Sequence, residues 1–325
     1  MKPPIREVFL FTDRRIMKKY FTLIFCVANL LSAEVFVADP SIFYHDGTYY
    51  LVGTDSHNHN NHFTIYTSKD FKTWSNKDKD GKIQYALDPK KAFVGRRCVA
   101  PQLFKYKDKF IFAYSEYRLA FAKADTPIGP FTQDVPACIQ AKSKQIDPYV
   151  FVDDDGKRYV YFSFADKVKN WIYVAEIDET FTKLTNLKPC ICAENGWENT
   201  ANHKIPVTVE GPTVIKRNGK YVLFYSANDF RDKDYAVGYA VSDSPTGEWT
   251  RAKNNPIIRR DIVGHAGAGH GDIFFDAKGD IWYVFHTHYS DEKVAPRRTA
   301  IIKLKETFEN GIPRYEVVKE SFRFL

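Results

Sequence analysis

One segment design recurs five times along this chain, and no other feature restricts the possible folds as strongly. Each copy has a polar or small residue as its head, then an apolar strand, a tight turn and a second apolar strand. The heads are Asp39, Ala100, Asp147, Glu210 and His270. Their spacing of 47 to 63 residues is typical of the blades of a β-propeller with insertions. The sequence therefore predicts an all-β, five-bladed β-propeller.

The turn of each copy lies at a nearly constant distance from its head. Gly156, Gly219 and Gly279 each follow their head by nine residues, and Gly47 follows Asp39 by eight. We therefore interpret the five heads as equivalent positions. Further strand patterns follow the hairpins, which predicts four antiparallel strands in each blade.

The topology of a propeller predicts where the heads meet. The first strand of every blade lines the central axis, so all five heads are expected at one end of that axis. Loops that join the second and third strands, and the long connections between blades, are expected to form the rim. His57 and His288 in two such loops, and Trp197 in a long connection, are therefore candidates for contacting a ligand.

The charge of the chain is concentrated before the repeats. The net charge is +7, and residues 1–33 supply more than half of it. The rest of the sequence intersperses both signs and contains no basic stripe, which argues against a nucleic-acid partner. Residues 34–325 contain no linker-like segment and are expected to form a single domain.

The first 33 residues have the composition of a targeting segment. Lys18 and Lys19 precede the apolar run 20–31, and Ser32 and Ala33 follow it. This pattern predicts a secretory signal peptide with translation starting at Met17, and hence an exported protein. The apolar run is shorter than the roughly 20 residues that span a bilayer, so no stable membrane insertion is expected after cleavage.

Three of the heads carry carboxyl groups, namely Asp39, Asp147 and Glu210. Bringing like charges together raises their pKa values, and an arrangement with that cost indicates a functional site. An Asp-Pro pair can simply start a turn, as at Asp88-Pro89, but Asp88 lacks the strand, turn and strand that follow Asp39 and Asp147. Paired carboxyl groups in a pocket rich in aromatic residues indicate hydrolysis of a glycosidic bond.

The segments around these carboxyl groups resemble glycoside hydrolase family 43. They read A-D-P at Asp39, I-D-P-Y-V-F-V-D-D-D-G at Asp147 and V-E-G-P-T-V-I-K-R-N-G-K-Y at Glu210, and the resemblance covers residues 35–325. It implies a five-bladed propeller that inverts the anomeric carbon. By the same resemblance Asp39 is the general base, Asp147 tunes the acid and orients the substrate, and Glu210 is the general acid. Related invertase-like propellers have Cys after the Glu, whereas Gly211 stands here.

Two further positions carry the resemblance, and one departs from it. His270 is similar to an axial histidine beside a water-coordinated calcium ion, although it could equally be a hydrogen-bonded core histidine. Arg298 resembles an arginine that reaches sugar hydroxyls, and either Arg297 or Arg298 could instead be a surface charge. Many members have Trp where this chain has Val99, so the resemblance leaves the floor of the sugar site open.

The sequence as a whole predicts an exported, inverting glycoside hydrolase that removes terminal α-L-arabinofuranosyl or β-D-xylosyl units from plant-type oligosaccharides or polysaccharides. A β-galactosidase or an endo-arabinanase on the same fold is the first alternative. The second is a glycan-binding propeller without catalysis, which has no need to bear the repulsion of three acidic residues. No nucleotide or phosphate motif is present, so no organic cofactor is expected.

Overall fold

The computed structural model describes residues 34–325 except for 56–60, 142, 166–169, 195 and 202–207. The chain divides into two compact units, residues 1–33 and 34–325, and all described residues belong to the second. No helix in this described part is long and apolar enough to cross a membrane. Its helical segments are the short η1 (Gly196–Asn199) and α2 (Arg260–Val263).

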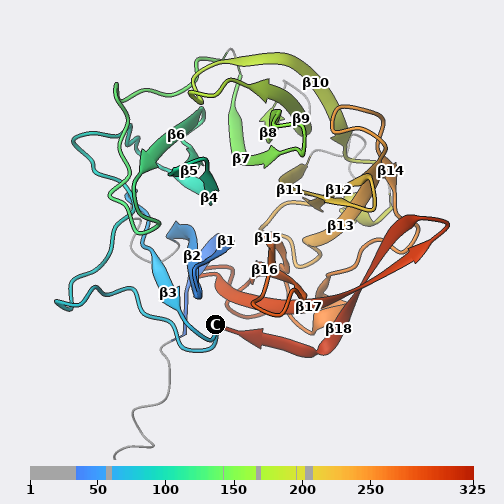
Figure 1. Ribbon diagram of the computed structural model, residues 1–325. Helices are drawn as coiled ribbons and strands as arrows, with labels where there is room; N and C mark the ends of the chain where they lie inside the picture. The colour runs from blue at the N-terminus through green and yellow to red at the C-terminus, as the bar shows by residue number, and fades with distance from the viewer. Residues whose placement is uncertain (1–33, 56–60, 142, 166–169, 195, 202–207) are drawn as a thin grey trace, which may run out of the picture. The chain divides into compact units, whose positions relative to one another are not determined.

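Five antiparallel sheets form a ring in the described part of the second unit (Figure 1), which confirms the predicted five-bladed propeller. Blade 1 contains β1 (Val37–His45), β2 (Thr48–Asp55) and β3 (Tyr66–Ser68), and blade 2 contains β4 (Val99–Tyr106), β5 (Lys109–Ser115) and β6 (Leu119–Ala124). Blade 3 contains β7 (Gln145–Val152), β8 (Arg158–Ala165), β9 (Asn170–Ile177) and β10 (Leu184–Cys192). Blade 4 contains β11 (Val209–Arg217), β12 (Lys220–Ala227), β13 (Ala236–Ser242) and β14 (Thr250–Arg251). Blade 5 contains β15 (Gly269–Phe275), β16 (Ile281–Thr287), β17 (Arg298–Glu309) and β18 (Ile312–Phe324).

The outermost position differs between the blades. Blades 3, 4 and 5 have four strands each, as predicted. In blades 1 and 2 the fourth position is reduced to isolated antiparallel bridges, Thr67 with Ser75 and Lys123 with Thr132. The inner hairpins, which carry the heads, are complete in all five blades.

Apolar residues fill the space between neighbouring blades. Each of the five hydrophobic clusters in the described residues joins two adjacent sheets, because both faces of an inner strand are buried. Between blades 1 and 2, for example, the ring of Phe112 packs against Phe63 with the ring centroids 5.2 Å apart. The core of this unit is therefore distributed around the ring.

Residues from both ends of the second unit close the ring at blade 5. The N–H of Val35 donates to the carbonyl of Leu325 at 2.7 Å, and the N–H of Thr299 donates to the carbonyl of Val35 at 3.1 Å. Val35 and Leu325 are both buried in the cluster between blades 5 and 1. Blade 5 is thus held to blade 1 by hydrogen bonds as well as by packing.

The first strand of each blade contains a β-bulge near its N-terminal end. The register shifts between residues 38 and 41, 99 and 102, 146 and 149, 210 and 213, and 269 and 271. A bulge places one extra residue in the strand and bends it, which directs a side chain away from the pleat. The first residue inside each bulge has a φ angle between 42° and 60°, and these residues are Asp39, Ala100, Asp147, Gly211 and His270.

The bulges correct one sequence interpretation. Gly211, and not Glu210, occupies the position equivalent to Asp39 and Asp147, so the interpretation of Glu210 as an equivalent head is wrong. Glu210 lies one residue earlier, at the position that Val99 and Ile146 occupy in blades 2 and 3. The number of residues between each head and its turn glycine could not reveal this offset, because the hairpins themselves differ in length by one residue.

Candidate active site

The inner ends of the first strands surround a small pocket of about 170 Å³. All three predicted carboxyl groups line it, and so do the apolar residues that precede two heads. The lining consists of Asp39, Arg97, Val99, Tyr117, Lys144, Ile146, Asp147, Glu210, Phe230, His270 and Arg297. We name this pocket the axial pocket. Its volume is below that of sites for drug-sized ligands, so it suits a single sugar unit.

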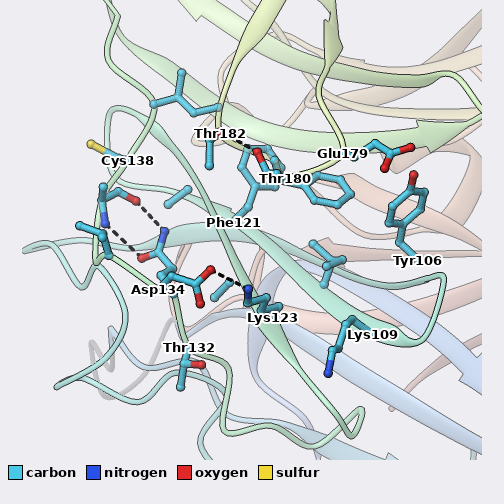
Figure 2. Close-up of a pocket in the computed structure, with 18 of the residues that line it drawn as sticks. Tyr106, Lys109, Phe121, Lys123, Thr132, Asp134, Cys138, Glu179, Thr180 and Thr182 are labelled. Atoms are coloured by element: carbon cyan, nitrogen blue, oxygen red, sulfur yellow. Dashed lines mark hydrogen bonds and ion pairs between the residues drawn. The ribbon is translucent and has the colours of Figure 1, made fainter.

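A larger cavity of about 490 Å³, here named the outer groove, lies between blades 2 and 3 (Figure 2). Its charged side chains form exposed ion pairs with one another, as Lys107 does with Glu179 and Lys123 with Asp134. Of its aromatic residues, Phe121 and Phe181 are buried in the cluster between the two blades. The buried carboxyl groups of Asp39 and Asp147 line the axial pocket instead.

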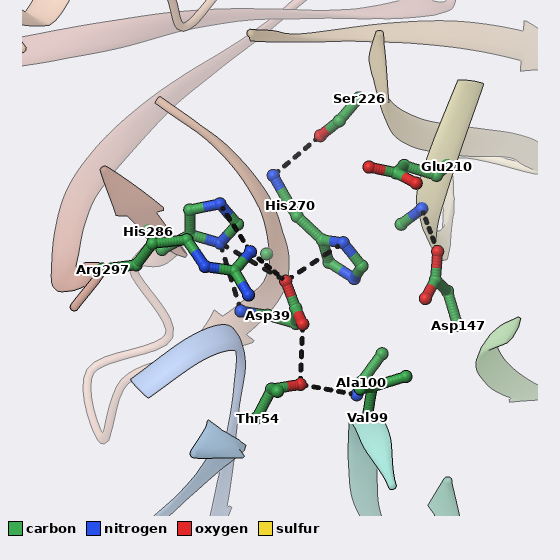
Figure 3. Close-up of polar contacts among 12 residues, drawn as sticks. Asp39, Thr54, Val99, Ala100, Asp147, Glu210, Ser226, His270, His286 and Arg297 are labelled. Atoms are coloured by element: carbon green, nitrogen blue, oxygen red, sulfur yellow. Dashed lines mark hydrogen bonds and ion pairs between the residues drawn. The ribbon is translucent and has the colours of Figure 1, made fainter. Parts of the chain in front are cut away.

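Asp39 is the most highly coordinated carboxyl group of the axial pocket (Figure 3). Its Oδ2 accepts a hydrogen bond from Thr54 Oγ1 at 2.6 Å, and its Oδ1 lies 3.1 Å from Arg297 Nη1 and 3.4 Å from His270 Nδ1. Burial alone would raise the pKa of Asp39. The charge of Arg297, together with His270, His286 and the Thr54 hydroxyl, instead holds that pKa well below its usual value. Asp39 therefore remains a carboxylate.

His286 supports Asp39 from blade 5 and was not among the predicted site residues. The backbone N–H of Asp39 donates to His286 Nδ1 at 3.1 Å, and His286 Nε2 lies 3.3 Å from Arg297 Nη1. Burial, followed by the nearby charge of Arg297, holds the pKa of His286 well below its usual value. The imidazole is thus neutral and fixes the backbone at the Asp39 bulge.

Asp147 lies across the pocket from blade 1, on blade 3. Its Oδ2 accepts hydrogen bonds from Ser163 Oγ at 3.1 Å and from the backbone N–H of Gly211 at 3.3 Å. Burial raises the pKa of Asp147, the charge of Asp39 raises it further, and His270 opposes the shift. The bond to Gly211 ties Asp147 to the residue that follows Glu210.

Glu210 is contacted by Tyr235, whose hydroxyl donates a hydrogen bond to Oε1 at 2.8 Å. Burial raises the pKa of Glu210 to about 7, and the charge of Asp147 contributes to the rise. His270 and the Tyr235 hydroxyl oppose the shift but do not cancel it. Glu210 can therefore hold a proton near neutral pH while Asp39, in the same pocket, cannot.

His270 lies among the three carboxyl groups and takes its backbone position from blade 4, where Ser226 Oγ accepts its N–H at 2.8 Å. Burial would lower the pKa of His270, but Asp39, Asp147 and Glu210 raise it above its usual value. Gly211 packs against the ring, because a Cβ there would lie 2.9 Å from two ring carbons. A larger residue at 211 would displace the imidazole.

The remaining predicted contacts are placed differently. Arg297 lines the pocket with its guanidinium 4.9 Å above the ring of Phe230, whereas Arg298 pairs with Glu34 and lies over Phe324. Neighbouring residues of an extended segment point to opposite sides, so only one of the two arginines can reach the axis. The expected placement of Arg298 in the pocket is thereby corrected to Arg297.

Of the other three rim candidates, the two that the structure describes, Trp197 and His288, are not among the residues that line the axial pocket. Trp197, in η1, packs against Tyr225 with the ring centroids 5.7 Å apart and belongs to the core between blades 3 and 4. His288 is buried, and its Nε2 lies 2.9 Å from the carbonyl oxygen of Phe230, so it supports a residue that does line the pocket. His57 lies outside the described residues.

Several lining residues were not singled out from the sequence. Phe230 and Tyr117 belong to loops between second and third strands, and the topology placed those loops on the rim. Tyr235, which contacts Glu210 without lining the pocket, immediately precedes β13, and nothing in its sequence context distinguishes it from core tyrosines. The histidine-rich segment 286–288 is a signal for His286, since a buried histidine usually serves a polar neighbour.

A second, smaller cavity of about 30 Å³ lies on the axis next to the heads. Asp272 borders it, and its carboxylate accepts hydrogen bonds from Ser41 Oγ at 2.6 Å and Thr213 Oγ1 at 3.2 Å. No basic side chain in the described part of the chain forms an ion pair with Asp272, and burial raises its pKa to about 7. The described residues contain no group of three or more His, Cys, Asp or Glu side chains that could hold a metal ion.

Comparisons with known proteins bear on this geometry. The sequence matches the profile of "Glycosyl hydrolases family 43" over residues 33–313. It is 30% identical over 162 residues to a beta-D-galactofuranosidase of Aspergillus niger, covering 49% of this chain and 42% of that protein. It is 29% identical over 207 residues to an arabinoxylan arabinofuranohydrolase of Paenibacillus polymyxa, covering 58% and 31%. The chain therefore spans less than half the length of these two relatives.

Solved structures resemble the whole propeller. An endo-1,4-beta-xylanase from Bacteroides thetaiotaomicron superposes with a TM-score of 0.78 at 33% identity, covering 88% of this chain and 97% of that one. A thermostable family-43 glycoside hydrolase superposes with a TM-score of 0.76 at 29% identity, covering 89% and 95%.

Proposed function

The chain belongs to the glycosyl hydrolases of family 43, and from that premise we propose that it is an inverting glycoside hydrolase with Glu210 as general acid and Asp39 as general base. One observation carries the assignment. Two carboxyl groups of one pocket have pKa values moved in opposite directions, Asp39 downward and Glu210 upward to about 7. Such a separation assigns the acid and the base.

The reaction follows from these protonation states. Glu210 donates its proton to the glycosidic oxygen as the bond from that oxygen to the anomeric carbon breaks. A water molecule attacks the same carbon from the opposite face, and its proton passes to Asp39 as the new carbon–oxygen bond forms. Asp147 raises the pKa of Glu210 by its charge, which keeps the acid protonated near neutral pH.

Arg297, His270 and Thr54 hold the carboxylate of Asp39, the proposed base, in place. Arg297 and His270 contact Asp39 Oδ1, and Thr54 contacts Oδ2, so the carboxylate cannot rotate freely. Holding a reacting group in one orientation is a large part of the catalytic effect of an enzyme. Arg297 also lines the pocket, where a guanidinium can donate to sugar hydroxyls.

We propose a terminal pentosyl unit, α-L-arabinofuranosyl or β-D-xylosyl, as the sugar that is removed. The axial pocket has room for one sugar unit, which supports removal of terminal units over cleavage within a chain. The names of the relatives include arabinofuranohydrolase and β-xylosidase activities. The galactofuranosidase and endo-xylanase among the similar proteins make those two activities the alternatives to test.

Chromogenic pentosides and galactosides, followed by proton NMR of the first product, test the proposal. We expect release of a pentose whose anomeric configuration is opposite to that of the bond cleaved. An inverting enzyme needs its two carboxyl groups roughly 6.5 to 9.5 Å apart, so that a water molecule fits between them and the substrate. Asp39 and Glu210 lie on blades 1 and 4, which are not neighbours in a ring of five, and this supports inversion. A retained anomer, or a sugar covalently attached to Asp39, would show that the base is wrongly assigned.

Calcium remains a proposal of the same kind. The axial cavity presents the Asp272 carboxylate and the hydroxyls of Ser41 and Thr213, which are the oxygen ligands that a hard cation prefers. A buried carboxylate without a basic partner would gain from such an ion. Bound calcium would supply positive charge beneath His270, and no catalytic step above depends on it. Elemental analysis of the purified protein tests for the ion.

We also propose that the protein is exported and acts outside the cytoplasm on plant-type glycans. The support is the charged, apolar and small-residue pattern of residues 17–33, together with a polymeric substrate class. Sequencing the N-terminus of protein recovered from the culture medium or periplasm tests this. A mature chain that still begins at Met17 would contradict it.

A further inference from the structure

The mouth of the axial pocket is asymmetric in charge. On the side of blades 2 and 3 the lining includes Arg97, which precedes β4, Tyr117, between β5 and β6, and Lys144, which precedes β7. Arg97 and Lys144 are exposed, and Tyr117 is 50% exposed. Two positive charges and one aromatic face therefore lie together where a substrate leaves the pocket.

These two charges are not neutralised by neighbours. Neither Arg97 nor Lys144 forms an ion pair with any described residue, although both line a pocket whose floor is acidic. Glu116, in the same loop as Tyr117, accepts a hydrogen bond from the backbone N–H of Arg96 instead. The positive charge at this side of the mouth is therefore available to a ligand.

The aromatic residue, Tyr117, is held in a defined position beside Lys144. Tyr117 has a φ angle of 56°, and its carbonyl accepts the N–H of Gln145 at 3.1 Å, which ties the loop of blade 2 to the first strand of blade 3. Lys144 Nζ lies 5.2 Å from the centroid of the Tyr117 ring. This cation–π contact orients the ammonium group without cancelling its charge.

The opposite side of the mouth lacks this feature. There Phe230 lines the pocket, and the charges beside it are already paired, Asp229 with Arg231 at 2.5 Å and Arg297 with Asp39 at 3.1 Å. Among the lysines and arginines that line the pocket in the described part of the chain, those without an ion pair, Arg97 and Lys144, therefore lie on the side of blades 2 and 3.

We propose that Arg97, Tyr117 and Lys144 bind a uronic acid unit adjacent to the sugar that is cleaved. The inference rests on the proposed glycosidase function and narrows its substrates to acidic glycans. Arg97 and Lys144 pair with the sugar carboxylate, for which a guanidinium offers two parallel N–H donors. Tyr117 packs against the apolar face of the same sugar ring. Because the Asp39 carboxylate repels an anionic substrate, positive charge at the mouth also offsets that repulsion.

The test compares two substrates that differ only in charge. The first is a xylo-oligosaccharide that carries one glucuronic acid next to the cleaved unit, and the second is the same oligosaccharide with the carboxyl group reduced to an alcohol. We expect kcat/KM to be about three- to tenfold higher for the acidic form at low ionic strength, since exposed charge pairs are individually weak. The preference should shrink as salt is added. A sulfated version of the reduced oligosaccharide separates general attraction of anions from recognition of a carboxylate.

Two double variants make the test specific. Arg97→Gln with Lys144→Gln should remove the preference for the acidic substrate, and Tyr117→Ala should weaken binding of both forms. Lys305→Gln with Lys319→Gln is the matched control, because it removes the same net charge from exposed positions on the outer strands of blade 5. That control should retain the preference, which excludes long-range steering by net charge as its cause.

The outcomes separate this inference from the proposed function. Equal kcat/KM for both substrates, an unchanged preference in the Arg97 and Lys144 variant, or an equal preference for the sulfated substrate would overturn the uronic acid site while leaving glycosidase activity intact. If neither substrate is hydrolysed, calorimetric titration of the same oligosaccharides still decides the inference. Tighter binding of the acidic form, lost in the Arg97 and Lys144 variant, would then support the site although the proposed function had failed.

Discussion

The axial pocket and the outer groove are both hollows in one ring, and they differ in almost every physical property. The groove is about 490 Å³ and the axial pocket about 170 Å³. In the groove, carboxyl groups such as those of Glu179 and Asp134 are exposed and paired with lysines. In the axial pocket Asp39 and Asp147 are buried, and Glu210 has a raised pKa.

We infer from this difference that the electrostatic cost of burying charged groups is a better guide to the catalytic site than cavity volume is. An exposed ion pair gains little free energy and requires little support from the fold. Buried carboxyl groups are maintained only where hydrogen bonds and charges have been arranged around them, as Thr54, Arg297 and Tyr235 are here. Each of the following predictions therefore changes one of the two hollows and asks whether the other responds.

The largest effect is expected from removing the acid or the base. Glu210→Gln and Asp39→Asn should each lower kcat by about 10²- to 10⁴-fold, because each removes a proton transfer. Lys123→Gln, which breaks an exposed ion pair in the outer groove, should leave kcat within a factor of two of wild type, at about the level expected for a surface change. Steady-state kinetics on a chromogenic pentoside measures all three. Near-normal turnover in either carboxyl variant would end the comparison.

Substitutions in the outer groove should instead change the stability of the protein. The buried ring of Phe121 has its centroid 5.7 Å from that of Phe181. Phe121→Ala removes this ring and should lower the free energy of unfolding by about 3 kcal/mol or more. Urea denaturation measures this loss, and Phe121→Leu is the control because it retains most of the packing. Activity per folded molecule should be unchanged in both. A loss of activity without a loss of stability would place chemistry in the groove.

A smaller effect is expected in the dependence of activity on pH. Since the pKa of Glu210 is raised to about 7, the acid loses its proton above that pH, and kcat/KM should fall about tenfold per pH unit. Tyr235→Phe sharpens the test. The Tyr235 hydroxyl stabilises the ionised form of Glu210, so its removal should raise the pKa and move the alkaline limb to higher pH. A limb that moves to lower pH would refute the assignment of Glu210 as the acid.

Much of this architecture was predictable from the sequence, for a definite reason. The strand, turn and strand that follow each head bury both faces of the inner strand, and that requirement leaves a repeating apolar pattern. The repeat predicted the blades, and their topology predicted that loops containing Tyr117 and Phe230 would lie at the pocket. Asp39, Asp147 and Glu210 are together in the structure because they lie at the inner ends of three such strands.

What the sequence could not provide depends on local backbone geometry. A bulge adds one residue without changing the apolar pattern, so the offset of Glu210 was not visible from the turns, although Pro40, Pro148 and Pro212 align with Gly211 as the head. The choice between Arg297 and Arg298 depends on which neighbour faces the axis. His286 acts through a backbone N–H, and a contact with the main chain leaves no partner residue type to search for.

The offset of Glu210 by one residue has a consequence for how such a ring becomes an enzyme. Five similar blades place five nearly equivalent backbone positions around one axis. A sugar bound there, however, is chiral and has different groups on every side. Catalysis therefore requires symmetry breaking. Here the backbone keeps its repeated form, with a bulge in every blade, while the proposed acid is the residue before a bulge and the proposed base is a residue within one. The ring can thus diversify its chemistry by exchanging side chains at two neighbouring levels, with the blades themselves left unaltered.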